Sequence, residues 1–360
     1  ALRDNVETIR RLAGPQMILA VVKADAYGHG AKVCARAMQP HIDYFAVASV
    51  DEGIELRLAG IERPILVFGP PEDRTAPAYV SHQLTATVSD PSHFSILMDG
   101  TRYHLNIDTG MRRLGIPPDR LSETRTQALM NTRLTCAGIF SHLATAEDPD
   151  SSMVKDQLER FRTALTHFPE VPLRHLCNSG GLFTHRIMEF DMVRIGLPLW
   201  GFMPGVSDPI RRVVHPESRA AASSLKPVMR WSSRVVQTRR LQNGDTVSYG
   251  AAWSAPDDGW LSTIPVGYAD GYRRRPTRPL SVGCVWEGEA RRFPVVGTVT
   301  MDYIMIDTGS VRLPNGTAVD LLGGTGPDAW ELADVYDAIP FDIFTGISSR
   351  VPRDYEREGN

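Results

Sequence analysis

The stretch MILAVVKADAYGHG, residues 17–30, decides the fold, because a short apolar run ends there in a lysine and then turns through small residues and glycines. Seven similar apolar runs follow: YFAVASV (44–50), PILVFG (64–69), LTATVS (84–89), YHLNID (103–108), LTCAGIFSH (134–142), LRHLCNS (173–179) and MVRIGLPLW (192–200). Amphipathic segments lie between the runs, with apolar residues at three- and four-residue steps, as in 51–60, 119–131 and 151–168. Eight strand and helix units predict an α/β fold, a (β/α)8 barrel of the TIM type, in which the carboxyl ends of the strands carry the chemistry.

The pattern changes after the eighth run. Residues 205–227 are rich in Pro, Ser and Arg, which is typical of a linker between domains. Closely spaced strand candidates with turn residues between them follow: 229–241, 246–253, 260–269, 280–288, 290–297 and 303–309. One helix is expected at 329–339. The predicted organisation is a barrel over 1–204, a linker over 205–227 and a mainly β domain over 228–360.

The composition indicates a globular chain, with 42% hydrophobic and 22% charged residues. A formal net charge of −3 gives no reason to expect a nucleic-acid or anionic-membrane partner, so we expect a small-molecule partner. The four cysteines are scattered and no histidine cluster has zinc-ligand spacing, so we expect reduced thiols, no metal and a cytoplasmic location. No apolar run approaches the ~20 residues of a membrane span.

Lys23 stands at the end of the first run, at the expected mouth of the barrel. An amine there is poorly solvated, and desolvation lowers its pKa, so that it can form a Schiff base near neutral pH. Spacing alone favours a simpler reading, in which Lys23 extends its charged end into solvent from a strand end.

The family resemblance changes this weighting. The stretch VVKADAYGHG resembles the pyridoxal-phosphate (PLP) lysine motif of alanine racemases, which belong to PLP fold-type III. Eight further stretches resemble the blocks of that family in the same order: 106–115, 140–148, 177–181, 192–201, 247–253, 263–275, 296–307 and 347–353. The resemblance therefore spans nearly the whole chain, except for the family's usual opening strand ahead of residue 1.

The resemblance implies a racemase with two bases. Lys23 would bind PLP through its amine and exchange the Cα proton on one face, and Tyr249, in VSYGAAW, would serve the opposite face. A tyrosine in a predicted strand is otherwise usually a packed aromatic. The family's active sites are shared in a homodimer, so Tyr249 would reach the Lys23 of the partner chain.

The resemblance also implies the remaining site residues. Arg194 would contact the pyridine nitrogen, and His142 would stack on the cofactor ring and hydrogen-bond to Arg194. The substrate carboxylate would be held by Arg113 and by the backbone N–H of Met301, and Tyr268 would line the substrate's access passage. Further cofactor contacts, mainly to the phosphate, would come from Tyr27, Asn178, Ser179, Gly196 and Leu197. Simpler roles exist for these residues: a salt bridge for Arg194, surface charge for Arg113, core packing for His142, Met301 and Tyr268, and helix capping for Asn178 and Ser179.

Three positions depart from the family pattern. Asn106 stands where the family commonly has a lysine, often carbamylated, Ser349 replaces a phosphate-binding tyrosine, and Arg112 replaces a glycine. These changes affect the support of Arg113 and the phosphate contacts, while both bases remain.

The leading interpretation is thus a PLP-dependent alanine racemase that supplies D-alanine for peptidoglycan. Three alternatives stay open at this point: a racemase acting on serine or other amino acids, a PLP carrier without catalysis, and a PLP-dependent decarboxylase. Relative kcat/KM across amino acids would separate the first, and CO2 release would identify the last.

Overall fold

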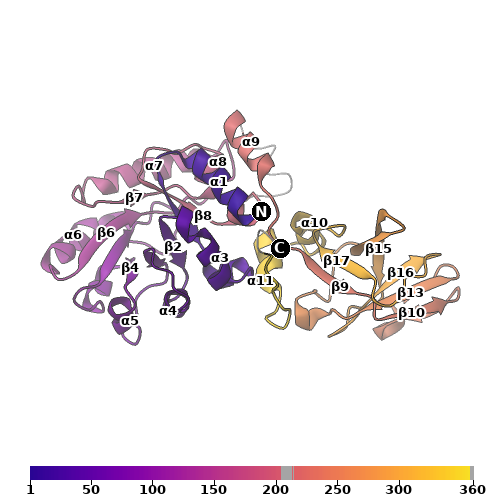
Figure 1. The fold of residues 1–360 in the computed structure, drawn as a ribbon. Coiled ribbons are helices and arrows are strands. Elements are labelled where there is room, and N and C mark those ends of the chain that lie inside the picture. Colours follow the sequence, from indigo (N-terminus) through magenta and orange to yellow (C-terminus); the bar gives the residue numbers. More distant parts are fainter. Residues whose placement is uncertain (204–212, 214, 357–360) are drawn as a thin grey trace. The chain divides into compact units, whose positions relative to one another are not determined.

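The computed structural model describes residues 1–203, 213 and 215–356. The chain divides into two compact units, Ala1–Lys226 and Pro227–Asn360, and Figure 1 draws both. Part of the expected linker, 205–212 and 214, lies outside the described residues. Among the described residues, no helix combines the length and apolar character that crossing a membrane requires.

Eight parallel strands form the wall of the first unit, which confirms the predicted barrel. They are β1 (Met17–Val21), β2 (Tyr44–Val47), β3 (Ile65–Val67), β4 (Leu84–Val88), β5 (Arg102–Asn106), β6 (Thr135–Phe140), β7 (Arg174–His175) and β8 (Met192–Ile195). Their spatial order is β7-β6-β5-β4-β3-β2-β1-β8. Backbone N–H groups of Asp191 and Arg194 donate to the carbonyls of Arg174 and Cys177, which joins the two ends of the sheet.

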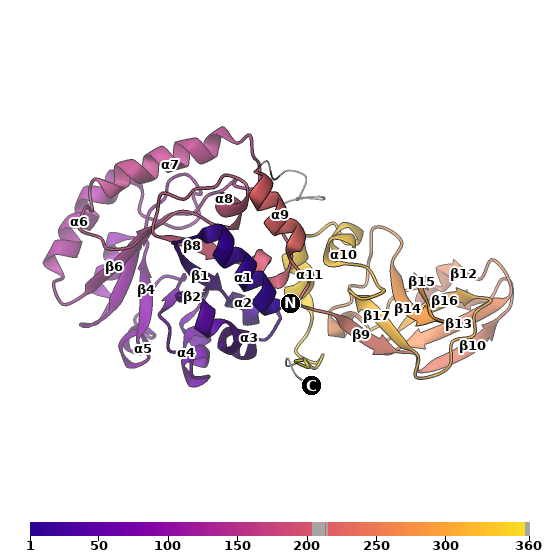
Figure 2. The same ribbon diagram turned by 45° about the horizontal axis from the view of Figure 1, so that its top comes forward.

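Helices surround this sheet, and Figure 2 shows α6 and α7 along its outside. The helices of the unit are α1 (Leu2–Ala13), α2 (Lys23–Tyr27), α3 (Ala31–Met38), α4 (Val50–Leu58), α5 (Ala76–Ser81), α6 (Leu121–Met130), α7 (Ser152–Leu165), α8 (Ser179–Phe183) and α9 (Pro216–Ser224). A five-residue 3₁₀ helix, Pro91–Ser95, is the helical element between β4 and β5, so that unit has less helix than the repeating pattern predicts.

Local sequence explains where these helices start and how they pack. In α1, Val6, Ile9 and Ala13 are buried at helical spacing, with Asp4 in the first turn and basic residues in the last, which suits the helix dipole. In α4, Ser49 and Glu52 form a capping box, each satisfying a backbone N–H of the other. The strands β1 and β2 are buried along almost their whole length, as expected for a parallel sheet covered by helices.

The helix α9 lies within the stretch 205–227 and belongs to the first unit. It packs against α1, and the side chain of Asn5 in α1 exchanges hydrogen bonds with the backbone of Lys226 at 2.8 Å in both directions. The described residues that lead to the unit boundary are therefore fixed to the barrel.

The second unit contains a seven-stranded antiparallel sheet in the order β10-β13-β16-β15-β14-β17-β9. Its strands are β9 (Trp231–Arg234), β10 (Gln237–Leu241), β13 (Gly259–Ile264), β14 (Ser281–Trp286), β15 (Glu289–Val296), β16 (Ile304–Gly309) and β17 (Ala318–Leu322). A two-stranded ribbon joins β11 (Thr246–Val247) to β12 (Trp253–Ser254). One core cluster contains Leu241, Val247, Ala255, Leu261 and Val296.

Several expectations for this unit are corrected. The run 229–241 forms two strands, β9 and β10, and the run 260–269 ends as a strand at Ile264, ahead of a 3₁₀ helix, Tyr268–Asp270. The run 246–253 is not one strand, because Ser248, Gly250 and Ala251 have φ of 67°, 76° and 46° and form a 3₁₀ turn, Tyr249–Ala251, between β11 and β12. The strand β17 was not predicted. The described part of the unit, up to residue 356, also has two α-helices where one was expected, α10 (Ala329–Val335) and α11 (Pro340–Gly346).

Candidate active site

The barrel residues singled out in the sequence gather at the carboxyl ends of the strands. Lys23 follows β1, Arg113 lies in the loop after β5, and His142 follows β6. Three others surround the ends of β7 and β8: Ser179, Arg194 and Gly196. This is the end of a (β/α)8 barrel where active sites are built.

Lys23 is half-buried and close to other charged groups. Burial lowers the pKa of its amine, and the positive charge of Arg113 lowers it further, while the Glu52 carboxylate acts in the opposite direction. A lowered pKa leaves more of the amine unprotonated and nucleophilic near neutral pH. The chemistry expected of Lys23 therefore has a physical basis in its surroundings.

Arg194 lies in β8 and is only 3% exposed. Its guanidinium donates to the carbonyl oxygens of Ser141 at 2.6 Å and His175 at 2.8 Å, and its Nη2 lies 3.4 Å from Nδ1 of His142. Burial lowers its pKa to about 10, so it stays charged at neutral pH. These partners are neutral, which leaves the positive charge available to a bound ligand.

His142 is held in its neutral form. Burial and the positive charges of Arg194, Arg113 and Lys23, in that order, lower the pKa of His142 to about 3. The ring therefore adds no positive charge to a site that already contains three cations.

His175 and His104 form a buried chain behind Arg194 that sequence reasoning missed. Nη1 of Arg194 lies 3.1 Å from Nδ1 of His175, and Nε2 of His175 lies 2.8 Å from Nδ1 of His104. A guanidinium only donates, so His175 accepts at Nδ1, carries its proton on Nε2 and donates it to His104. His104 then carries its own proton on Nε2, an atom without a hydrogen-bond partner among the described residues. The available signal was that His175 lies within the seventh apolar run, as His142 lies at the end of the sixth.

Tyr27, Ser179 and Gly196 come together beside β8. The backbone N–H of Gly196 donates to Ser179 Oγ at 3.2 Å, and a Cβ at Gly196 would lie 2.9 Å from the Tyr27 hydroxyl. Only glycine allows that close approach. Leu197 begins the next 3₁₀ helix, Leu197–Trp200. Hydroxyls and backbone donors converging in this way suit an anion.

Asn178 has a structural task in addition to any ligand contact. Its Oδ1 accepts from the backbone N–H of Gly181 at 2.9 Å and caps α8, and its Nδ2 donates to the carbonyl of Leu143 at 3.3 Å. The capping role considered from the sequence is thus present for this side chain.

The three departures from the family pattern occupy different surroundings. Asn106 is buried and donates from Nδ2 to Ser89 Oγ at 3.2 Å. Arg112 has φ of 53°, the left-handed region that favours glycine, which gives a physical reason for the family's glycine at that position. Arg113 and Ser349 are exposed. The expected effect of Asn106 on the support of Arg113 stays a prediction.

The second unit holds the other predicted residues. Thr298 Oγ1 donates to the carbonyl of Tyr249 at 2.8 Å, which fixes the turn that carries this tyrosine. The backbones of Tyr268 and Met301 lie side by side, because the N–H of Ala269 donates to the carbonyl of Met301. Tyr249 is 70% exposed and Met301 52% exposed, so large apolar side chains are uncovered in the single chain.

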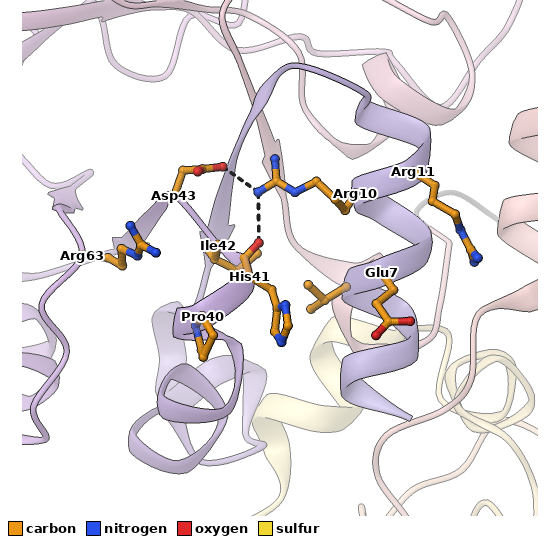
Figure 3. Close-up of a pocket in the computed structure, with 9 residues that line it drawn as sticks. Glu7, Arg10, Arg11, Pro40, His41, Ile42, Asp43 and Arg63 are labelled. Atoms are coloured by element: carbon orange, nitrogen blue, oxygen red, sulfur yellow. Dashed lines mark hydrogen bonds and ion pairs between the residues drawn. The ribbon is translucent and has the colours of Figure 1, made fainter.

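A cavity of about 470 Å³ lies at the opposite, amino end of the barrel strands, and Figure 3 shows residues that line it. There Arg10 donates to the Asp43 carboxylate and to the carbonyl of His41. Asp43 Oδ2 also accepts from the backbone N–H of Ile18. These bonds tie α1 to the starts of β1 and β2, and in a (β/α)8 barrel this end serves stability.

Comparison with known proteins identifies the family. The models described as "Alanine racemase, N-terminal domain" and "Alanine racemase, C-terminal domain" match residues 1–204 and 228–355. An alanine racemase of Symbiobacterium thermophilum is 36% identical over 99% of this chain and 95% of its own length. One of Streptococcus pneumoniae serotype 19F is 34% identical over 99% of this chain and 95% of its own length.

Solved structures agree. The alanine racemase of Bacillus anthracis with bound L-Ala-P has a TM-score of 0.87 and 30% identity, covering all of this chain and 94% of the other. That of E. faecalis has a TM-score of 0.88 and 28% identity, covering 99% and 95%. The sequence blocks, the two units and the full-length matches agree, and the chain belongs to the alanine racemase family.

Proposed function

We propose that this chain is a PLP-dependent alanine racemase that interconverts L-alanine and D-alanine, with Lys23 and Tyr249 as its two bases. The observation that carries the proposal is the half-buried Lys23 amine at the mouth of the barrel, with its pKa lowered by burial and by Arg113. The full-length relatives named above, all called alanine racemases, support the same reaction.

The barrel residues fit PLP. Lys23, Arg113 and Arg194 bring positive charge to the site, and the Tyr27, Ser179 and Gly196 group suits a phosphate. PLP, when bound, supplies a ring that withdraws electrons from the substrate's Cα–H bond. Lys23 would hold the cofactor through its amine, and Arg194 would face the pyridine nitrogen.

The role of Arg194 is to bind the pyridine nitrogen without transferring a proton to or from it. Burial lowers the pKa of Arg194 only to about 10, so at neutral pH the guanidinium is already protonated. It donates a hydrogen bond and takes up no proton. An acidic residue at this place would keep the ring nitrogen protonated and favour side reactions. The chain from Arg194 through His175 to His104 holds the guanidinium in one orientation.

Proton transfer needs one base on each face of the substrate. The Lys23 amine takes or returns the Cα proton on one face, and the Tyr249 hydroxyl does so on the other. Arg113 and the backbone N–H of Met301 hold the substrate carboxylate, which fixes the Cα between the two bases.

The active site is completed in a homodimer, in which Tyr249 of one chain faces Lys23 of the other. The exposure of Tyr249 and Met301 supports this arrangement, because a partner barrel would cover them. The proposed product, D-alanine, would be made in the cytoplasm for peptidoglycan. The match of residues 228–355 to a racemase domain argues against a PLP carrier, which needs no second base.

Chiral analysis of L-alanine incubated with the purified chain and PLP tests the function. We expect a mixture of both enantiomers from either starting enantiomer. L-serine, L-lysine and L-arginine in parallel measure the substrate range, and CO2 release is followed in the same samples. Unchanged L-alanine with intact, PLP-loaded protein would refute the proposal.

A further inference from the structure

Lys23 begins a backbone segment of unusual handedness. Ala24, Asp25 and Ala26 have φ of 52°, 51° and 56° with ψ of 54°, 48° and 47°, and Tyr27 has φ of 54°. Four successive residues other than glycine thus lie in the left-handed region, at a cost of roughly 1–2 kcal/mol each. The surroundings have to compensate for this strain.

The carboxylate of Glu52 links this segment to the backbone at the end of β2. Glu52 Oε1 accepts from the backbone N–H of Ala24 at 2.6 Å, and Oε2 accepts from that of Ala48 at 2.7 Å. Ala24 directly follows Lys23, and Ala48 follows β2. Glu52 therefore joins the ends of β1 and β2 at the first left-handed residue.

Other bonds also hold the segment, and the backbone N–H of Ala26 donates to the carbonyl of Val22 at 2.9 Å, across Lys23. The N–H of Gly28 donates to the carbonyl of Ala24, and the N–H of Ala31 donates to Asp25 Oδ1 at 2.7 Å. The bond to Glu52 is charge-assisted, and it holds the backbone N–H of Ala24, the residue next to Lys23.

Glu52 also carries the opposite charge to Arg113, the other charged group that acts on the pKa of the Lys23 amine. Arg113 from the loop after β5 lowers the pKa of Lys23, and Glu52 from α4 raises it. His142, after β6, also lies within electrostatic reach of Lys23, and burial and nearby cations keep it neutral. Among Arg113, His142 and Glu52, only Glu52 carries a negative charge near the Lys23 amine.

We propose that Glu52 is a positioning residue for Lys23: by bridging the N–H groups of Ala24 and Ala48 it fixes the left-handed segment that aims the Lys23 amine into the barrel mouth. The inference deepens the role given to Lys23 under the proposed function and rests on it. Glu52 acts through the backbone and through its charge, and does not itself touch the substrate.

The test compares Glu52→Gln with Glu55→Gln, an exposed glutamate on the same helix. The full-length chain, freed of PLP, is reductively methylated at a series of pH values, and mass spectrometry follows the Lys23 peptide. Removing the negative charge of Glu52 removes an influence that raises the Lys23 pKa. The labelling midpoint should move to lower pH by about half a unit or more in Glu52→Gln and stay unchanged in Glu55→Gln.

Amide hydrogen exchange reads the backbone part of the proposal. In Glu52→Gln, exchange over residues 22–30 should become roughly tenfold faster, as expected for the loss of a hydrogen bond to a charged group. Exchange in the β5 and β6 peptides should stay the same. Unchanged labelling and exchange, or equal changes in Glu55→Gln, would overturn the proposal.

Glu52→Asp covers the case in which Glu52→Gln does not fold. Aspartate keeps the charge but is one methylene shorter, so it is unable to bridge both N–H groups. Faster exchange over 22–30 with a smaller change in the labelling midpoint is expected, and wild-type exchange in this variant would contradict the bridging role. The readouts report on the amine and the backbone, so a chain that failed to racemise alanine could still give either result.

Discussion

Lys23 is the residue on which the proposed chemistry depends. We predict that Lys23→Ala abolishes covalent attachment of PLP, because Lys23 directly follows β1 and its amine is half-buried with a lowered pKa. Borohydride reduction followed by mass spectrometry should show a PLP-modified peptide in the wild type and none in the variant. Lys32→Ala, an exposed lysine on α3, is the matched control and should keep the modification. A modified lysine in the Lys23→Ala chain would identify another anchor.

Tyr249 is predicted to serve one face of the substrate only. Replacing it with phenylalanine removes the hydroxyl and keeps the ring, so Cα-proton exchange with solvent should fall more for L-alanine than for D-alanine. Mass spectrometry of each enantiomer incubated in D2O measures this difference. An equal loss for both enantiomers would argue against separate bases, unless the two groups titrate together.

Some residues of the candidate site could be predicted from the sequence, and others could not. Lys23 and Ser179 could be placed at one barrel end because each closes an apolar run, and Arg194 because it lies within the eighth run. Glu52 carried a signal, since Ser49 and Glu52 have capping-box spacing, but that pattern indicates only a helix start. The hydrogen bond between Glu52 and Ala24 depends on the left-handed backbone of residues 24–27. No side chain of that stretch, ADAY, predicts such a backbone.

Close packing between elements gives a prediction in the second unit. A Cβ at Gly283, in β14, would lie 2.1 Å from the carbonyl oxygen of Thr325, whereas one at Gly346, in α11, would meet nothing within 4 Å. Gly283→Ala should therefore lower the free energy of unfolding by roughly 3 kcal/mol, and Gly346→Ala should change it by less than about 0.5 kcal/mol. Urea unfolding of both variants measures the difference. Equal stabilities would show that the Thr325 backbone moves aside at little cost.

The eight barrel strands were predictable because a buried parallel strand needs a continuous apolar run, and each run is bounded by turn residues. The prediction of a strand around Tyr249 was wrong. The residues there favour a strand, but the positive φ of Ser248 and Ala251 comes from the tertiary structure. The strand β17 was missed since AVDLL is short, and its pairing with β9 and β14 joins distant parts of the chain.

Acid should destabilise the barrel as a whole. Burial lowers the pKa of His104 and of His142 to about 3, whereas an unfolded histidine titrates near 6.5. The unfolded chain therefore binds more protons below about pH 6.5, and each such histidine removes up to about 1.4 kcal/mol of stability per pH unit between those values.

We predict that His104→Gln, although less stable at pH 7, loses less stability between pH 7 and pH 5 than the wild type does. Amide exchange of barrel peptides in urea measures this slope at each pH. His41→Gln, at an exposed histidine, is the control and should keep the wild-type slope. A wild-type slope in His104→Gln would show that this residue does not contribute.

Assembly is predicted to matter because the two proposed bases, Lys23 and Tyr249, lie in different units of the chain. Lys23→Ala and Tyr249→Phe chains should each be nearly inactive for L-alanine, and a mixed dimer should regain one intact site. Differently tagged chains, refolded together and purified by both tags, allow activity per mixed dimer to be compared with the wild type. No recovery in verified mixed dimers would place both bases in one chain's own site.

The segment after Lys23 also has a consequence for chirality. The backbone at Ala24 is the mirror image of that in an ordinary helix, and a D-residue prefers it for the same steric reason that an L-residue avoids it. Ala24 is exposed, and a chain assembled by chemical ligation could carry D-alanine at this position. Such a chain would be relieved of strain by the very enantiomer that the enzyme is proposed to make.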